Sequence, residues 1–175
     1  CMMLDIIGPY NFWQREQETG IERDELKIVG ELANIKGVAL ILTGVRRCGK
    51  TFLSRQLLKR IEPEMTLYIN FEVEEIQPFI KRGVIDEIYK EYRRRINPNK
   101  KAWVVLDEVH VVPEWERWVR SILEKGENVN IIVTGSGTKI VTPRLASILT
   151  GRKVKFTLFP LSFNQVLRFK KVKPP

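Results

Sequence analysis

The chain has 175 residues, of which 43% are hydrophobic and 29% are charged, and this suits one globular domain but not two typical ones. Its 30 basic and 21 acidic side chains give a formal charge of +9. The longest apolar run near the middle, residues 38–42, is far shorter than the roughly 20 residues that cross a bilayer, and no basic-then-apolar signal opens the chain. Two cysteines cannot build a disulfide framework. We therefore expect a cytoplasmic protein that neither spans a membrane nor is secreted.

The excess positive charge lies entirely at the end of the chain. Residues 1–138 contain 21 basic and 21 acidic side chains, whereas residues 139–175 contain nine basic side chains and no acidic one. Such a segment attracts DNA or an acidic partner. Alternatively, its acidic counterpart belongs to a further part of a longer protein. The charge pattern leaves both interpretations open, and the start Cys1-Met2-Met3 also suggests a fragment.

Apolar periodicity predicts helices and strands that alternate along the chain. The predicted helices are 22–32, 50–61, 76–96 with a break at Gly83, 114–124 and 162–169, and the predicted strands are 38–42, 66–71, 103–106, 129–134 and 153–159. Continuous apolar runs such as 38–42 are typical of strands buried on both faces of a parallel sheet. The alternation therefore predicts an α/β fold, with a parallel sheet between two layers of helices.

A glycine-bounded loop follows the first predicted strand. Residues 44–51, Gly-Val-Arg-Arg-Cys-Gly-Lys-Thr, match the Walker A pattern G-x-x-x-x-G-K-[ST] and lie between a strand and a helix, as this motif requires. Its backbone N–H groups would surround phosphate oxygens, Lys50 would neutralise them, and Thr51 would bind Mg²⁺. The Cys48 thiol is expected to face the phosphates. The predicted nucleotide-binding residues here are Gly44, Val45, Arg46, Arg47, Cys48, Gly49, Lys50, Thr51 and Phe52.

Two carboxylates end the third predicted strand. Asp107 and Glu108 follow the apolar run 103–106, at the edge where open parallel sheets bind ligands. Asp107 is a predicted Mg²⁺ ligand, and Glu108 is a predicted catalytic residue that polarises the attacking water, as in a Walker B motif. Acid pairs also end strands by chance, but their combination with the phosphate loop favours the functional interpretation.

Hydroxyl side chains end the fourth predicted strand. Thr134 and Ser136 flank Gly135 and are candidates for a hydrogen bond to the γ-phosphate or to the attacking water. A polar turn after a core strand is the alternative. The single histidine, His110, is expected to be an ordinary surface or core side chain, since one histidine does not suggest a zinc site. A polar contact that couples the site to a ligand is the alternative.

Taken together, these motifs resemble the AAA-type ATPases of archaea and bacteria, which carry a GxRRxGKT-like loop, a strand ending in LDE and a strand ending in TGS. The later stretches 113–115, 149–152 and 159–163 also resemble that family's signatures. The resemblance covers residues 21–163. It implies a P-loop NTPase fold, a three-layer αβα sandwich around a central, mainly parallel five-stranded sheet. Residues 1–20 would then be a lead-in, and residues 164–175 the start of a truncated C-terminal region.

The resemblance also implies an activity. An ATPase of this family would hydrolyse ATP with Mg²⁺ and drive a conformational change in a partner or nucleic-acid complex. It makes Arg152 a candidate catalytic arginine, in its own subunit or in the site of a neighbouring copy within a homo-oligomer, although a solvated arginine is the equal alternative. The other functions considered are an ATP-dependent binding switch with negligible turnover and a small P-loop kinase, for which no acceptor pocket is recognisable.

Overall fold

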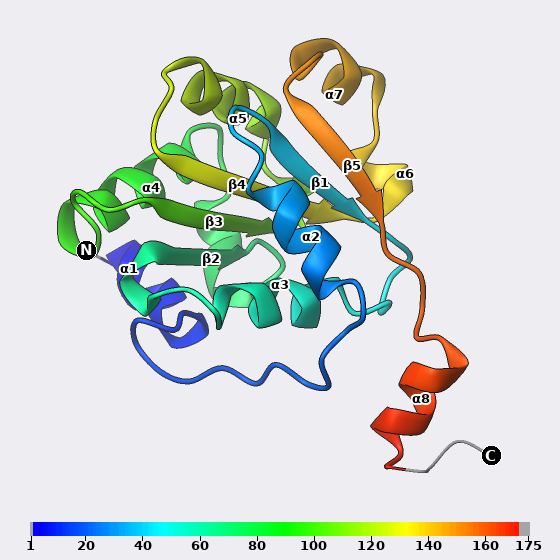
Figure 1. The fold of residues 1–175 in the computed structure, drawn as a ribbon. Coiled ribbons are helices and arrows are strands. Elements are labelled where there is room, and N and C mark those ends of the chain that lie inside the picture. The colour runs from blue at the N-terminus through cyan, green and yellow to red at the C-terminus, as the bar shows by residue number, and fades with distance from the viewer. Residues whose placement is uncertain (1, 172–175) are drawn as a thin grey trace.

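The computed structural model describes residues 2–171 and contains one sheet of five strands in the order β2-β3-β4-β1-β5 (Figure 1). All neighbouring strands pair in parallel. The strands are β1 (Ala39–Thr43), β2 (Thr66–Asn70), β3 (Ala102–Asp107), β4 (Val129–Gly135) and β5 (Lys153–Thr157). The α-helices are α1 (Met2–Ile7), α2 (Leu26–Ala33), α3 (Lys50–Leu58), α4 (Val84–Arg95), α5 (Trp115–Glu124), α6 (Gly137–Ile140), α7 (Pro143–Ile148) and α8 (Phe163–Phe169).

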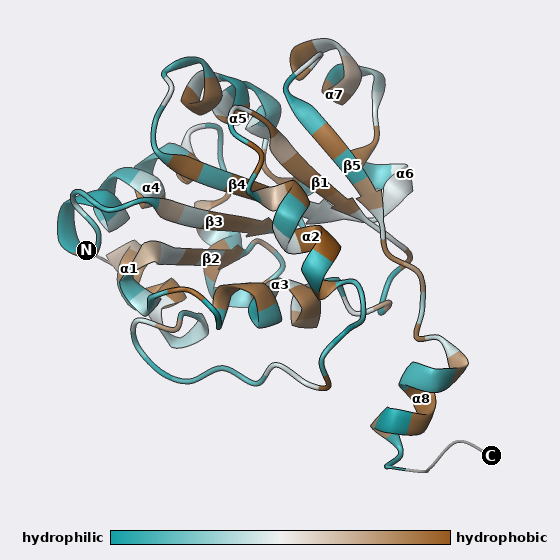
Figure 2. Cartoon of the chain, viewed as in Figure 1, coloured by the Kyte–Doolittle hydropathy of each residue, from teal (hydrophilic) through white to brown (hydrophobic). Residues whose placement is uncertain are grey.

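Both faces of the sheet are covered by helices. Along β1, Ala39 and Ile41 belong to a buried cluster with α1, α4 and α5, whereas Leu40 and Leu42 belong to a second cluster with α2 and α3. This split arises because successive side chains of a strand point to opposite faces. Figure 2 shows β1 and β3 largely in the hydrophobic colour, β5 alternating between the two colours, and the long connection between α1 and α2 largely in the hydrophilic one. The predicted α/β sandwich with a parallel five-stranded sheet is confirmed.

Some element boundaries differ from the predicted ones. The predicted helix 76–96 is divided into a 3₁₀ helix, Glu74–Phe79, and α4, with Gly83 in the left-handed conformation (φ 89°) between them. Pro78 lies inside the first piece, where it cannot donate an α-helical hydrogen bond. The first predicted helix begins at Leu26 rather than at residue 22, and the backbone N–H of Arg23 donates to the Gln56 side chain.

The start of the described chain packs against the core. Met3, Leu4 and Ile7 of α1 are buried in the first cluster. The side-chain amide of Asn11 pairs with the backbone of Tyr68, accepting from its N–H (2.7 Å) and donating to its carbonyl (2.9 Å). Asn11 thereby satisfies backbone groups of the edge strand β2 as a neighbouring strand would.

Within residues 2–171, no helix combines the length and the apolar character needed to cross a membrane.

Candidate functional site

The phosphate loop joins β1 to α3 and depends on its glycines. A Cβ atom on Gly44 would lie 2.5 Å from the Leu158 carbonyl oxygen and 2.6 Å from the Cys48 sulfur, so a larger residue does not fit there. Gly49 has a φ of 102°, and Arg47 also adopts the left-handed conformation, at 64°. These torsions let the backbone turn tightly before the first residue of α3.

Lys50 lies on the inner side of this loop. Lys50 is 5% exposed, and its Nζ atom donates to the carbonyls of Gly44 (3.0 Å) and Val45 (3.1 Å). The ammonium group therefore lies between the carbonyl groups at the start of the loop. The Cys48 thiol belongs to the buried cluster beneath the loop and lies 3.8 Å from the Lys50 Nζ atom.

The exposure of the other loop residues separates them from Lys50. Val45, Arg46 and Arg47 are exposed, and Phe52 is partly exposed on the first turn of α3. In this position the two arginine side chains reach solvent beside the loop, so they are available to an anionic ligand.

Asp107 is the centre of a buried hydroxyl network at the end of β3. The residue is 1% exposed, and its carboxylate accepts from Thr51 (2.8 Å), Thr134 (2.5 Å) and Tyr68. The sheet order explains this, because β4 lies between β1 and β3 and brings Thr134 between the loop and the acid. Burial and the Asp107 charge raise the pKa of the Tyr68 hydroxyl well above its usual value, so Tyr68 remains a donor.

Tyr68 was not identified from the sequence. It occupies an alternating core position in an apolar strand, where a tyrosine is an ordinary large side chain. The one available signal was its hydroxyl, since a buried tyrosine hydroxyl usually has a hydrogen-bond partner.

The oxygen atoms of Thr51 and Asp107 fit a magnesium ion. Mg²⁺ prefers oxygen ligands and is commonly held by one or two protein groups together with phosphate oxygens. The Thr51 hydroxyl and the Asp107 carboxylate are within 2.8 Å of each other beside Lys50, and hydroxyl groups donate to the carboxylate. These are the two residues predicted to bind the metal.

Glu108 is held in an unusual backbone conformation beside Asp107. Its φ is 54°, and its N–H donates to the Thr134 hydroxyl (3.2 Å). Burial, followed by the charges of Asp107 and Glu72, raises the pKa of Glu108. A carboxylate with a raised pKa is a better proton acceptor, which suits the predicted role.

His110 lies beside Glu108. Its Nδ1 atom lies 3.3 Å from a carboxylate oxygen of Glu108, and burial lowers the pKa of the imidazole, with Lys139 lowering it further. Ligand atoms of Glu72, Glu108 and His110 lie within 4.8 Å of one another. His110 is therefore a neighbour of the predicted catalytic acid.

Ser136 lies at the carboxyl ends of the strands, as the phosphate loop does, whereas Arg152 lies at the amino ends. Ser136 immediately follows β4 and precedes α6, with its hydroxyl 3.4 Å from that of Thr138. Arg152 precedes β5, and its carbonyl accepts from the N–H of Ala39 at the start of β1, whereas the phosphate loop follows the end of β1. Its guanidinium group lies 3.9 Å from Glu124. The geometry does not bring Arg152 to the phosphate loop of its own chain.

A cavity of about 320 Å³ adjoins the outer side of the phosphate loop. Cys48 and Gly49 form the loop side of its wall, and Phe52 contributes an aromatic ring. Its other walls come from Ile21 before α2, from Leu161 between β5 and α8, and from Phe169 of α8. The lining is mainly apolar, which suits a flat aromatic group rather than a phosphate.

Comparison with known proteins agrees with this geometry. A family model described as an AAA domain matches residues 36–167. The chain belongs to this family of AAA-type P-loop ATPases. It is 30% identical over 140 residues to an uncharacterized protein of Methanocaldococcus jannaschii and 31% identical over 137 residues to one of Haemophilus influenzae. These alignments cover 80% and 75% of the chain but 30% and 34% of the relatives, so this AAA domain spans about a third of their length.

Solved structures share the fold of this AAA domain at low identity. A Walker-type ATPase of Pyrococcus abyssi matches with a TM-score of 0.61 and 16% identity, over 91% of this chain and 63% of that one. A DNA polymerase III gamma subunit-related protein of Thermotoga maritima gives 0.58 and 15%, over 81% and 47%. Aeropyrum pernix ORC1, solved in complex with DNA, gives 0.54 and 17%, over 84% and 47%.

Proposed function

We propose that this AAA domain binds ATP together with Mg²⁺ and hydrolyses it to ADP and phosphate. The observation that carries the proposal is the 2.8 Å hydrogen bond between Thr51 and Asp107, because it joins the phosphate loop of β1 to the acid pair of β3 beside the Lys50 ammonium group. Cation, metal ligands and proton acceptor are thus assembled from segments more than 50 residues apart.

Each residue has a distinct role in this proposal. The loop N–H groups and Lys50 bind and orient the phosphates. Thr51 and Asp107 hold Mg²⁺, which supplies positive charge to the phosphate oxygens. Glu108 orients the attacking water and accepts its proton, and Thr134 fixes the backbone of Glu108 through the 3.2 Å hydrogen bond.

The cavity beside the loop is the proposed place for the adenine and ribose groups. It shares Cys48 and Gly49 with the phosphate loop, so a ligand whose phosphates lie on the loop has its nucleoside next to the cavity. Phe52 offers a partly exposed ring against which a base would stack.

Arg152 and the basic segment after residue 138 have proposed roles in contacts with partners. Since Arg152 lies away from its own phosphate loop, we propose that it acts on the site of a neighbouring copy. The basic segment after residue 138 is a proposed contact for DNA, whose binding would weaken with added salt. Driving a conformational change in such a partner is the proposed use of hydrolysis.

The test is calorimetric titration with MgATP and MgADP, followed by an assay of phosphate release. Lys50→Ala is expected to abolish measurable binding, because it removes the cation from the loop. Lys59→Ala is the matched control, since Lys59 is an exposed lysine at the other end of α3. Equal binding by the native chain and Lys50→Ala would refute the proposed site. Binding without phosphate release at any protein concentration would favour the binding switch instead.

A further inference from the structure

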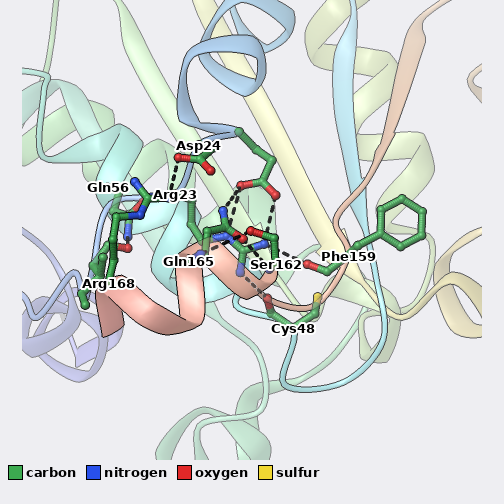
Figure 3. Close-up of polar contacts among 10 residues, drawn as sticks. Arg23, Asp24, Cys48, Gln56, Phe159, Ser162, Gln165 and Arg168 are labelled. Carbon is green, nitrogen blue, oxygen red and sulfur yellow. Dashed lines mark hydrogen bonds and ion pairs between the residues drawn. The ribbon is translucent and has the colours of Figure 1, made fainter. Parts of the chain in front are cut away.

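Arg23 is a buried cation that joins three segments distant in sequence. Its side chain is 4% exposed. The Nε and Nη2 atoms donate to the Glu25 carboxylate (3.2 and 3.1 Å), Nη1 donates to the Cys48 carbonyl (3.0 Å), and Nη2 also donates to the Phe159 carbonyl (2.8 Å). Burying a guanidinium group costs free energy unless its N–H groups are hydrogen bonded. Arg23 is therefore held where its N–H groups reach these acceptors. Figure 3 shows these contacts converging on Arg23.

The contact with Cys48 fixes a peptide plane in the phosphate loop. The Cys48 carbonyl belongs to the peptide that joins Cys48 to Gly49. The residues on either side of Cys48, Arg47 and Gly49, have left-handed backbone torsions. Because a trans peptide is planar, its N–H points opposite to its carbonyl. Holding the Cys48 carbonyl toward Arg23 therefore sets the direction of the Gly49 N–H. A Cβ on Gly49 would lie 3.2 Å from the Arg23 Nη1 atom, so the guanidinium group is in close contact with the loop.

The contact with Glu25 extends the connection to α8. The same Glu25 carboxylate accepts from the Gln165 side chain (3.0 Å), and Gln165 is 3% exposed. Gln165 is fixed in turn by a capping box with Ser162 at the start of α8. Burial raises the pKa of Glu25, but the hydrogen bonds from Arg23 and Gln165 outweigh this effect and lower it overall, so Glu25 stays an anion at neutral pH.

A second, separate contact holds α8 without involving the phosphate loop. Arg168 pairs with Asp24 at 2.6 Å on the protein surface. Exposed ion pairs contribute little to stability. The link through Arg23, in contrast, joins α8 to the loop through hydrogen bonds of the buried Arg23 and Gln165 side chains.

We propose that Arg23 is a positioning residue that couples the phosphate loop to α8, so that a nucleotide bound at the loop and the docking of α8 stabilise each other. The nucleotide part rests on the proposed function. Gln165 and Phe169 of α8 line the same cavity as Arg23, so the coupled helix is also a wall of the proposed nucleoside site. Coupling of this kind is reciprocal: whatever loosens α8 also loosens the loop.

Hydrogen exchange of the full chain with and without saturating MgADP tests the coupling. In the native chain we expect MgADP to slow exchange both at loop amides 46–50 and at α8 amides 166–170, by about tenfold in α8. In Arg23→Met, saturating MgADP still slows the loop amides, but the effect on α8 is lost. Arg23→Lys is expected to behave in the same way, because a single ammonium group cannot span the three acceptors.

Arg168→Ala is the matched control. It removes the surface contact of α8 and leaves Arg23 in place, so the effect of MgADP on α8 is retained. Protection of α8 that persists in Arg23→Met, or native protection confined to the loop, would overturn the proposal.

A measurement without nucleotide separates this inference from the proposed function. Gln165→Ala removes the hydrogen bond from α8 to Glu25 and leaves the Arg23 hydrogen bonds in place. This variant can therefore test the coupling even if Arg23→Met does not fold. We expect it to speed exchange of the Cys48 amide, which donates to the Val45 carbonyl at 3.2 Å, by at least about threefold. An unchanged rate would refute the coupling. If MgADP does not bind the native chain, the proposed function fails, and this nucleotide-free result alone decides the coupling.

Discussion

The predicted site residues at the two ends of the sheet differ in burial. At the carboxyl end, Lys50, Asp107 and Thr134 are at most 5% exposed and are hydrogen bonded to the loop or to one another. At the amino end, the Arg152 side chain is 36% exposed and has a loose ion pair with Glu124. Burying polar groups costs free energy unless each finds a partner. The buried network at the carboxyl end therefore surrounds the proposed nucleotide site.

Glu108→Gln is expected to have the largest effect of the substitutions at the carboxyl end of the sheet. Loss of the proton acceptor is expected to lower the rate of phosphate release about 100-fold or more, while nucleotide affinity is retained. Glu124→Gln, at the amino end, is the control and is expected to leave the rate unchanged. Native turnover in Glu108→Gln would contradict the role given to this carboxylate.

Tyr68→Phe tests whether the hydroxyl network around Asp107 supports the metal. The substitution removes one donor and keeps the ring, so the Mg²⁺ concentration for half-maximal phosphate release is expected to rise about tenfold. The matched control is Tyr92→Phe, whose hydroxyl donates to the Glu64 carbonyl before β2, at the amino end of the sheet. A similar shift in both variants would remove the distinction between the two ends.

The raised pKa of Glu108 predicts a pH-dependent effect on stability. A carboxyl group whose pKa is higher in the folded than in the unfolded state contributes stability at low pH and loses it as pH rises through the folded pKa. Glu108→Gln carries no such charge. Its melting temperature is therefore expected to exceed that of the native chain at pH 7, by less than about 4 °C. Differential scanning calorimetry should show this excess shrinking as pH falls to about 4.

Arg152→Ala has the smallest expected effect. Its guanidinium group does not reach the phosphate loop of the same chain, so nucleotide affinity in dilute solution should change by less than about twofold. If native phosphate release rises with protein concentration, this variant should lose the rise, as expected for an arginine that acts on a neighbouring copy. A large loss of affinity in the dilute variant would place Arg152 in its own site instead.

Most of the fold follows from local sequence patterns. The strand 38–42 and the loop 44–51 were identified because a buried apolar run and a glycine pattern are local signals. Helix α1 was not identified, since six residues are too few to show a helical period. The division between Glu74–Phe79 and α4 was only partly anticipated, through Gly83, because Pro78 could begin or interrupt a helix.

The amino-acid sequence by itself determined the five strands in chain order, the phosphate loop and the acid pair, because each depends on residues adjacent in the chain. Only the tertiary structure decided that Tyr68 completes the network around Asp107, that Arg152 lies at the far end of the sheet, and that Arg23 connects the loop to α8. These contacts join residues up to 140 positions apart. Strand order and helix packing bring such residues together, and no local pattern records them.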